Sequence, residues 1–295
     1  MQTIANEMKY QDELERFYNW GFPTYGLLIL RTLLSLQEVN ELAKLILSTN
    51  DSEVLRSAIN QVRKNLAIIT YQYSIDIPLW RARKCNDKHN GFDYIDEIMQ
   101  PPAHLTPANR LNNANEPMLY LSTGPHAVLS EVHADIGDYF HIIGLKFKEN
   151  KLITCGSIGD ISRYYKWQDS TSSESLDKLI SEVPRTHIDS LIFTDTFLSA
   201  LLSDKNAKDE EYIRTRILAD LLFKNNKIDA LTYPGVESEQ QKNFAIKPDV
   251  IDDTFEIANS FVIQVTDKYL CGMYGFETIR QAKSIDMKNR IIIWE

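Results

Sequence analysis

The sequence is poor in cysteine: only Cys85, Cys155 and Cys271 occur among its 295 residues. Three scattered cysteines support neither a disulfide framework nor a zinc knuckle, so each is expected to be a free thiol. The chain also has no run of about eighteen or more apolar residues, the length that a membrane-spanning helix needs. Its polar, acidic N-terminus does not have the pattern of a signal peptide. These absences predict a cytoplasmic protein without a membrane-spanning segment.

Positive charge is also scarce. The chain has 32 lysines and arginines against 41 aspartates and glutamates, a formal net charge of −9. This balance gives no general attraction to nucleic acid or to an anionic membrane surface, so neither is expected as a partner. An anionic small ligand would need locally concentrated positive charge, for which Arg81, Arg83 and Arg110 are the candidates. The glycine-rich phosphate loops of the common nucleotide-binding folds are absent as well.

The first seventy residues have the spacing of helices. Three helices are expected, over residues 12–20, 25–47 and 51–69, with Asn50, Asp51 and Ser52 as the candidates for the N-cap of the third. The leucine-rich stretch of residues 27–36 is more apolar than one buried helix face requires, so it should pack against neighbours or a second domain. The pattern predicts a helical N-terminal domain of residues 1–74.

Short segments rich in β-branched and aromatic residues follow from Pro78 onward. Such segments favour strands, which are expected at residues 79–82, 118–122, 141–147, 191–193, 230–233, 261–265 and 291–294. Helices are expected between them at residues 125–135, 175–183 and 209–224. Because these strands do not alternate regularly with long helices, a mixed α+β domain of residues 75–295 is favoured over a doubly wound sheet.

An irregular segment connects the first two of these strands. Residues 86–115 contain Pro101, Pro102 and Pro107 together with several asparagines. A connection of this length without regular structure is often functional in a compact domain. We expect it to lie over a ligand pocket.

Four blocks of this second domain place a polar or charged group beside a segment that is expected to be buried. They are LWRAR at residues 79–83, NRLN at 109–112, LYLSTGPHAVLSEV at 119–132 and TYPGVESEQQKNFAIKP at 232–248. Burying a charge is costly unless the charge is paired or used. The blocks therefore predict one polar pocket.

In their order and spacing the four blocks resemble the RES domain, a family named for its arginine, glutamate and serine. Its members have folds of the ADP-ribosyltransferase type and consume NAD. The matching residues are Arg81 for the family's arginine, Arg110 and Asn112 for its Arg-x-Asn element, Tyr120 for its Leu-Tyr-Leu segment, Glu131 for its glutamate and Asn243 for its Asn-x-Ala element. The resemblance extends from Leu79 to the C-terminal region.

The family's Tyr-Pro-Ser appears here as Tyr233-Pro234-Gly235, so a glycine stands where the family has its serine. Ser238 is the candidate substitute if its loop brings the hydroxyl to the pocket. The replacement also leaves open a catalytically silent copy that binds a nucleotide or a protein partner.

The resemblance implies an enzyme that removes nicotinamide from its substrate NAD and transfers ADP-ribose to phosphate as the co-substrate, without a cofactor. It also implies a toxin or defence protein that depletes NAD and has an antitoxin or another inhibitor as its partner. The N-terminal helices would offer a surface for that partner or for a homo-oligomer. The acceptor stays open, because water or, in a protein ADP-ribosyltransferase, a side chain could replace phosphate.

Glu131 is assigned to the reacting ribose, because a carboxylate can hold ribose hydroxyls and stabilise the positive charge that develops as neutral nicotinamide leaves. Its alternative is an ordinary carboxylate on a helix surface. Arg81 is assigned to the pyrophosphate or to the attacking phosphate, with an internal ion pair as its alternative. Arg83 shares the strand face of Arg81 and either assists it or emerges into solvent.

Arg110 and Asn112 precede a strand and are candidates for the phosphate or ribose of the adenylate half, although Asn112 would equally suit a local turn. Tyr120 either stacks on nicotinamide or packs in the core. Ser122 and Thr123 are expected to cap the helix that follows them, with a contact to the ligand as their alternative.

Histidine gives only a weak metal signal. His126 and His133 lie about two helical turns apart, without a cysteine or carboxylate at ligand spacing. No metal site is expected.

Overall fold

The computed structural model describes residues 25–27, 34–66, 68–85, 90–167, 173–204, 207, 212–235 and 241–295. Its strands are β1 (Tyr25–Leu27), β2 (Ile69–Tyr73), β3 (Leu79–Lys84), β4 (Leu119–Ser122), β5 (Tyr139–Phe147), β6 (Ile153–Ser157), β7 (Ala230–Pro234), β8 (Lys242–Ile246), β9 (Phe255–Lys268), β10 (Tyr274–Asp286) and β11 (Ile291–Trp294). Its α-helices are α2 (Leu36–Ser48), α3 (Ser52–Lys64), α4 (Ile95–Ile98), α5 (Pro125–Glu131), α6 (Asp160–Trp167), α7 (Ser173–Glu182), α8 (Arg185–Leu202), α9 (Tyr212–Asn225) and α10 (Ile251–Thr254). Short 3-10 helices are η1 (Ala103–Leu105), η2 (Pro248–Val250) and η3 (Leu270–Gly272).

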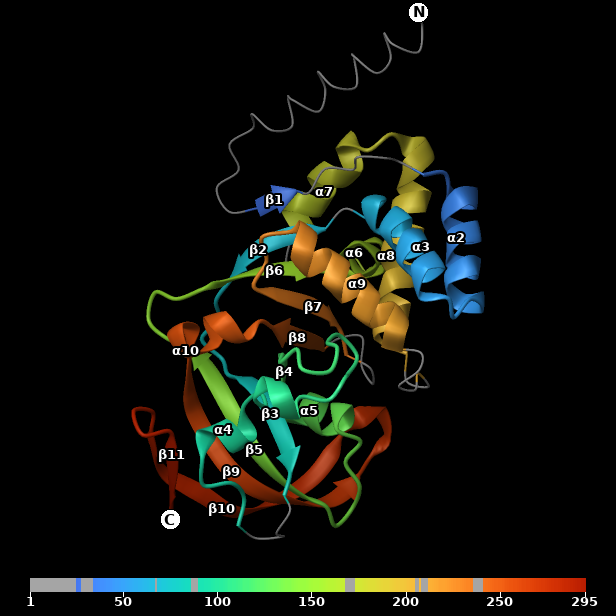
Figure 1. Cartoon of the computed structure of the whole chain (residues 1–295). Helices are drawn as coiled ribbons and strands as arrows, with labels where there is room; N and C mark the ends of the chain where they lie inside the picture. The colour runs from blue at the N-terminus through green and yellow to red at the C-terminus, as the bar shows by residue number, and fades with distance from the viewer. Residues whose placement is uncertain are drawn as a thin grey trace, which may run out of the picture.

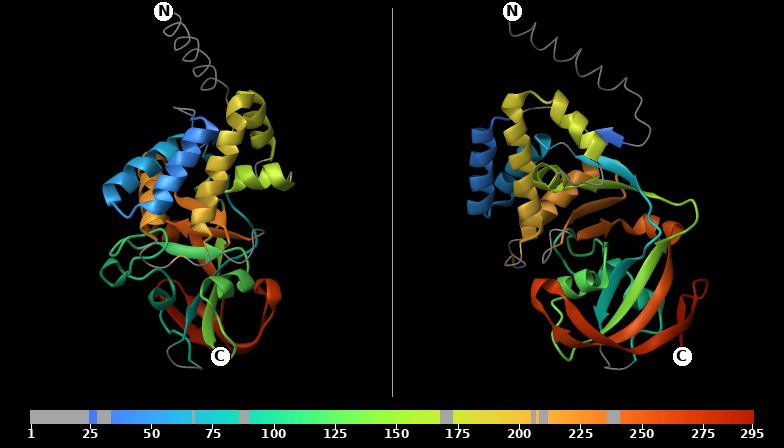
Figure 2. Two further views of the ribbon diagram at one scale, coloured as in Figure 1. Left: turned by 90° about the vertical axis from the view of Figure 1, so that its right-hand side faces the viewer. Right: turned by 180° about the vertical axis from the view of Figure 1, so that it is seen from behind.

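The strands of the described residues form one mixed sheet in the order β1-β2-β6-β7-β8-β4-β3-β5-β9-β10-β11 (Figure 1). Helices α2, α3, α8 and α9 gather at one end of the molecule, and the long strands β9 and β10 curve around the other end (Figure 2). The chain is therefore an α+β protein, as predicted. The finer prediction, an ADP-ribosyltransferase-like fold, is taken up with the proposed function.

Two parts of the sheet meet at a narrow seam between β3 and β4. These strands share a single paired position, Trp80 opposite Ser122. By contrast, β3 pairs with β5 over six positions and β4 pairs with β8 over four. The seam divides the sheet into one part that extends from β1 to β4 in the sheet order and another that extends from β3 to β11.

The first part of the sheet is covered by helices that share one hydrophobic core with it. The buried residues of this core come from α2, α3, α8, α9, β7 and β8, and they include Val39, Leu55, Leu198, Leu218 and Leu231. The boundary predicted between residues 74 and 75 thus falls inside one sheet, between β2 and β3. The division into two domains stays a prediction, and the deletion described in the Discussion tests it.

Two of the three helices predicted in the first seventy residues are present as α2 and α3, with bounds that differ from the predicted ones. Of the three candidates for the N-cap of α3, Asp51 caps the helix: its Oδ1 accepts hydrogen bonds from the N–H groups of Glu53 and Val54 at 2.9 and 3.0 Å. Residues 25–27 form strand β1 instead of the start of a helix, and α3 ends at Lys64 before strand β2. The helix predicted at residues 12–20 lies outside the described residues.

Most strands predicted after Pro78 are present: six of the seven segments correspond to β3, β4, β5, β7, β9 and β11, with Met118 just outside β4. The strand predicted at residues 191–193 is wrong, because these residues lie inside α8. The buried positions of α8 include Leu191, Thr194, Leu198 and Leu202, a spacing of three and four residues that fits a helix and not a strand. The predicted helices correspond to α5, α7 and α9.

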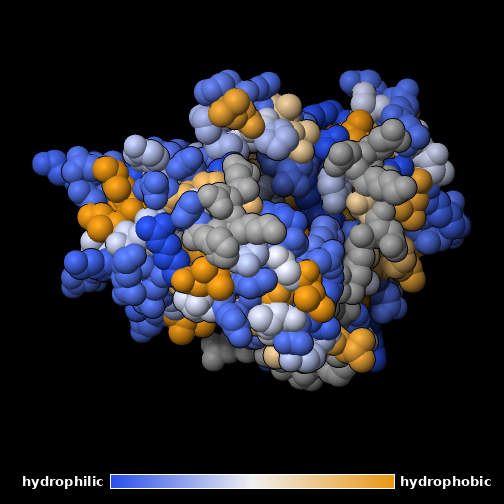
Figure 3. Space-filling model, turned by 90° about the horizontal axis from the view of Figure 1, so that it is seen from below, coloured by the Kyte–Doolittle hydropathy of each residue, from blue (hydrophilic) through white to orange (hydrophobic). Residues whose placement is uncertain are grey.

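No helix in the described ranges is long and apolar enough to cross a membrane. Seen from below, the described surface is mostly hydrophilic, and its hydrophobic residues form small separate patches (Figure 3). The described part of this face therefore offers no broad apolar area to another protein.

Candidate functional site

A cavity of about 320 Å³ lies at the seam, between β3, β4, β8, helix α5 and the connection that precedes β4. Its wall contains six of the eight residues predicted for the site: Arg81, Arg110, Asn112, Tyr120, Glu131 and Asn243. Pro101, Thr106 and Pro107 line it as well. The irregular segment of residues 86–115 therefore contributes to the wall of a pocket, as predicted from its length and its prolines.

A row of polar side chains crosses the cavity floor. In the sheet register, Asn243 of β8 is opposite Ser122 of β4 on one side and opposite Tyr233 of β7 on the other. Residues directly opposite each other on neighbouring strands project to the same face of the sheet. All three line the cavity, so one face of three adjacent strands supplies a hydroxyl, an amide and a phenol to the site.

Glu131 is held by this row. The Nδ2 of Asn243 donates a hydrogen bond of 2.7 Å to Oε1 of Glu131, and the Ser122 hydroxyl donates one of 2.6 Å to Oδ1 of Asn243. Asn243 and Ser122 are only 2% and 3% exposed. Because the serine occupies the amide oxygen, the amide nitrogen is directed at the carboxylate. Glu131 is therefore not an ordinary carboxylate on a helix surface.

The predicted capping of α5 by Ser122 or Thr123 is wrong. The N-cap of α5 is Gly124, which makes no side-chain capping bond, and Pro125 occupies the first turn. Thr123 instead accepts a hydrogen bond from the backbone N–H of Lys242 at 3.3 Å. Since Pro125 has no N–H, the helix start has fewer donors for a cap to satisfy.

Arg81 supplies positive charge to the wall of the cavity. Its Nε and Nη2 donate to the carbonyls of Ile98 and Met99 at 2.6 and 3.2 Å, and Nη1 donates to the carbonyl of Tyr120 at 3.3 Å. Burial, together with the charge of Arg83, lowers the pKa of the guanidinium to about 10. Within the described residues Arg81 pairs with no carboxylate, so the alternative of an internal ion pair is not found there.

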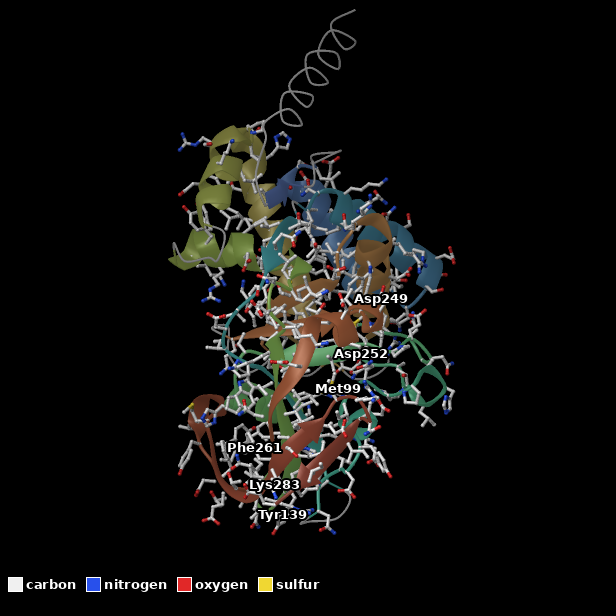
Figure 4. The ribbon with its side chains drawn as sticks, turned by 90° about the vertical axis from the view of Figure 1, so that its left-hand side faces the viewer. Met99, Tyr139, Asp249, Asp252, Phe261 and Lys283 are labelled. Carbon is white, nitrogen blue, oxygen red and sulfur yellow. The ribbon has the colours of Figure 1, made fainter. Side chains whose placement is uncertain are left out.

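The segment that Arg81 contacts is itself anchored. Figure 4 labels Met99, which follows α4, and Asp252 of α10. Arg290 connects these two elements, because it forms ion pairs with Asp96 of α4 at 2.6 Å and with Asp252 at 3.2 Å. The carbonyls that receive Arg81 therefore belong to a fixed turn.

Arg83 is not part of the cavity wall. It is exposed, lies 4.8 Å above the ring of Phe92, and donates to the carbonyl of Glu97. The predicted face parity is correct, because both arginines of β3 contact the α4 segment. However, Arg83 lies two residues beyond Arg81, past the point where β3 pairs with β4. The structure therefore leaves it outside the site that Arg81 enters.

Arg110 connects the cavity wall to the end of α8. Its Nη1 donates to the carbonyl of Leu202 at 2.8 Å, its Nη2 donates to the carbonyl of Asp204 at 3.1 Å, and its guanidinium lies 4.8 Å from the ring centre of Tyr212. A cation is favourable at a helix C-terminus, where carbonyls lack partners. In the described part of the chain Arg110, like Arg81, is bonded to carbonyls without a carboxylate partner.

Asn112 and Tyr120 support each other. The Tyr120 hydroxyl donates to Oδ1 of Asn112 at 2.8 Å and accepts from the N–H of Leu111 at 3.1 Å. The Nδ2 of Asn112 donates to the carbonyls of Pro107 and Asn113, both at 2.9 Å. Burial raises the pKa of Tyr120, so its hydroxyl stays protonated. The local turn expected as the alternative for Asn112 is thus present, and both side chains shape the wall.

Tyr233 was part of the TYPG block, but no role was assigned to its side chain. It is 3% exposed and lines the cavity. Burial raises its pKa, and the charge of Glu131 raises it further. Tyr212, Thr106, Asn109 and His133 also line the cavity without having been predicted.

Gly235 stands at the position of the missing serine, and Ser238 is the candidate substitute for it. Ser238 lies outside the described residues. Gly235 donates its N–H to the carbonyl of Gln241 at 2.8 Å, and it is not among the described glycines with a positive φ. It does not line the cavity.

The two histidines considered for a metal have separate environments. His126 accepts from the N–H of Tyr274 at 3.2 Å through Nδ1, while His133 lines the cavity. In the described portion no group of three or more histidine, cysteine, aspartate or glutamate side chains is arranged to hold a metal ion.

Comparison with known proteins gives no relative: no protein-family model matches the chain, and no curated protein matches it.

The charges of the site form a simple pattern. Two guanidinium groups, those of Arg81 and Arg110, reach the cavity while bonded to carbonyls. One carboxylate, that of Glu131, is placed there by an amide. The chain has a net charge of −9, so the two guanidinium groups are a local concentration of positive charge. This arrangement suits an anionic ligand whose hydroxyl groups donate hydrogen bonds to the carboxylate.

Proposed function

We propose that this chain cleaves NAD at the bond between nicotinamide and ribose and transfers ADP-ribose to phosphate. One observation carries the proposal: the cavity combines two cationic side chains, Arg81 and Arg110, that lack carboxylate partners in the described residues with a fixed carboxylate, Glu131. The two cations bind the pyrophosphate of NAD, and the carboxylate binds the hydroxyl groups of its nicotinamide ribose. The resemblance to the RES domain, and with it an ADP-ribosyltransferase-like fold, belongs to the same proposal.

The reaction needs little proton transfer. The bond between the ribose carbon and the pyridinium nitrogen breaks with its electron pair going to nitrogen, so nicotinamide leaves as a neutral molecule. Positive charge develops on the ribose, and the negative charge of Glu131 stabilises it. A phosphate oxygen then forms the new bond to carbon, which gives ADP-ribose 1″-phosphate.

Arg81 is assigned to phosphate oxygens. A guanidinium has five N–H groups in a planar fork, and the three carbonyl bonds of Arg81 leave donors for a ligand. Its position between Tyr120 and the α4 segment places the charge at the edge of the cavity. Arg110 is assigned to the adenylate half, with Tyr212 beside it.

A second candidate function is a nucleotide-binding protein without turnover. The observation that favours it is Gly235, which stands where the RES family has its serine and lies outside the cavity wall. Such a protein would bind NAD through the same cations and release it unchanged.

The test is incubation of the purified chain with NAD, with and without phosphate, followed by identification of the products by mass. We expect nicotinamide and ADP-ribose 1″-phosphate in the presence of phosphate. Glu131→Gln should lower the rate by about 100- to 1,000-fold, the usual loss for one electrostatic contact to a transition state. Glu256→Gln, at an exposed position on β9, is the control. Binding of NAD without any product would support the second candidate.

The biological setting is a further part of the proposal. An enzyme that consumes NAD would stop the growth of a cell that produces it, unless an inhibitor is present. Expression of the chain in a bacterial host should therefore lower the cellular NAD content, and expression of Glu131→Gln should not.

A further inference from the structure

The hydroxyl of Tyr233 is the feature of the cavity that the assignments above leave unexplained. Among the three tyrosines of the wall, the Tyr120 hydroxyl bonds to Asn112 and the Tyr212 hydroxyl accepts from Nη2 of Arg110 at 3.3 Å. The Tyr233 hydroxyl bonds to none of the described residues. It is not among the fully enclosed polar atoms that lack a partner in the described part of the chain, so it keeps access to the cavity, where a ligand can bond to it.

The location of Tyr233 indicates what its partner is. Its ring is 3% exposed, and it forms the end of the row Ser122, Asn243 and Tyr233 across the cavity floor. Asn243 in the middle of the row holds Glu131. Tyr233 and Glu131 are therefore both neighbours of Asn243, and both line the cavity. Burial raises the pKa of Tyr233, and the charge of Glu131 raises it further, so the phenol stays protonated.

The pair therefore presents one acceptor and one donor to the same part of the cavity. Glu131 accepts hydrogen bonds, and Tyr233 in its protonated form donates one. Two neighbouring hydroxyl groups on a sugar match such a pair, because one can donate to the carboxylate while the oxygen of the other accepts from the phenol.

We propose that Tyr233 is a ligand-binding residue that donates a hydrogen bond to one hydroxyl oxygen of the nicotinamide ribose, while Glu131 accepts from the neighbouring hydroxyl. This inference rests on the proposed function and adds to it a selectivity for ribose over deoxyribose. Tyr233 acts in binding, so its loss should affect KM more than kcat.

The experiment compares Tyr233→Phe with the unaltered chain. Removing a hydroxyl that has no protein partner should leave the melting temperature unchanged. The KM for NAD should rise about 3- to 10-fold, the value of one neutral hydrogen bond, with a smaller change in kcat. With one of the two NAD analogues that lack a single hydroxyl on the nicotinamide ribose, the variant and the unaltered chain should have equal KM values.

Tyr71→Phe is the matched control. Tyr71 is also buried, at 5% exposure, but its hydroxyl bonds to Oγ1 of Thr232 at 3.2 Å and it does not line the cavity. This variant should have a lower melting temperature than the unaltered chain and the same KM for NAD.

The outcomes separate a failure of the proposed function from a failure of the role of Tyr233 alone. If the unaltered chain neither binds nor cleaves NAD, the proposed function is wrong and the role of Tyr233 is overturned with it. If the chain is active and Tyr233→Phe has the KM of the unaltered chain, only the role of Tyr233 is wrong. The role of Tyr233 is also overturned if Tyr233→Phe has a lower melting temperature and an unchanged KM. The same holds if the KM of the variant exceeds that of the unaltered chain with both NAD analogues.

Discussion

Asn243 of β8 donates a 2.7 Å hydrogen bond to Glu131 at the end of α5, across 112 positions of sequence. Its own amide oxygen is occupied by the Ser122 hydroxyl at 2.6 Å. The direction of the amide, and with it the position of the carboxylate, is therefore determined by a serine on a third element. Asn243 also lines the cavity, beside the carboxylate that it positions, so its assignment as a substrate-binding residue stays a prediction.

The first prediction follows from this chain of bonds. Asn243→Ala should lower NAD cleavage by at least about 10-fold, because the carboxylate loses the bond that positions it. It should also cost about 1–3 kcal/mol of stability, since the Ser122 hydroxyl is left without a partner. Kinetics and chemical denaturation measure the two effects.

Ser122→Ala provides the matched comparison for Asn243→Ala. It leaves the bond from Asn243 to Glu131 in place but frees the amide to rotate, so we expect an intermediate loss of activity. An Asn243→Ala variant with the activity of the unaltered chain would show that Glu131 does not need this support.

The second prediction concerns the two arginines of β3. Arg81→Lys should weaken NAD binding and also lower the melting temperature, because an ammonium cannot reach the carbonyls of Ile98, Met99 and Tyr120 together. Arg83→Lys is the control on the same strand face and should leave NAD binding unchanged, because Arg83 lies outside the cavity. Calorimetry and thermal melting measure the two properties. Equal behaviour of the two variants would remove the assignment of Arg81 to phosphate.

The third prediction is a pH dependence of stability that arises from His141. The imidazole accepts at Nδ1 from the N–H of Phe92 at 3.2 Å and lies 2.8 Å from the Ser260 hydroxyl through Nε2. Burial lowers its pKa from 6.5 to about 3. As pH falls below 6.5, the unfolded chain takes up a proton that the folded chain does not, so stability is lost on acidification.

The expected loss from this group is about 1.4 kcal/mol per pH unit, or about 2 kcal/mol between pH 6.5 and 5. Urea denaturation at pH 7 and at pH 5 measures it. His141→Gln can accept and donate hydrogen bonds without titrating, so its stability should fall less between the two pH values. The prediction fails if both proteins lose the same stability.

The fourth prediction tests the two-domain division. Removing residues 1–74 should give an insoluble chain, because it exposes the core residues Leu198, Leu218 and Leu231 and strips β2 from β6. Removing residues 1–24 deletes none of the described elements and is the control. Recovery of a soluble monomer with full activity from the longer deletion would instead establish the helical segment as a separate domain.

The fold could be predicted where a segment has its own signal. Strands β4, β5 and β7 are mostly apolar and contain β-branched or aromatic residues. Strand β10 has no such pattern, because its residues are mostly exposed or half-buried and it exists by pairing with β9. Local propensity is a weak guide wherever tertiary pairing decides the structure.

The site, like the fold, could be predicted only in part from the sequence. The residue types and their blocks placed six side chains in one cavity, because charged groups beside buried segments need a common polar environment. What the sequence could not reveal is which of them touch one another. The signal that could have included Ser122 is its position two residues after Tyr120 in one strand, since alternate residues share a face. The bond from Asn243 to Glu131 depends on packing between distant segments.

The single paired position between β3 and β4 has a mechanical consequence. Arg81 on one side of the seam reaches the carbonyl of Tyr120 on the other, so a side chain replaces part of the missing backbone ladder. The cavity opens across this line of weak attachment, and its walls come from both sides. A molecule that fills it and bonds to both walls acts as a brace between the two parts of the sheet. Occupancy should therefore slow amide hydrogen exchange in β3 and β4 more than in the well-paired strands β5 and β9.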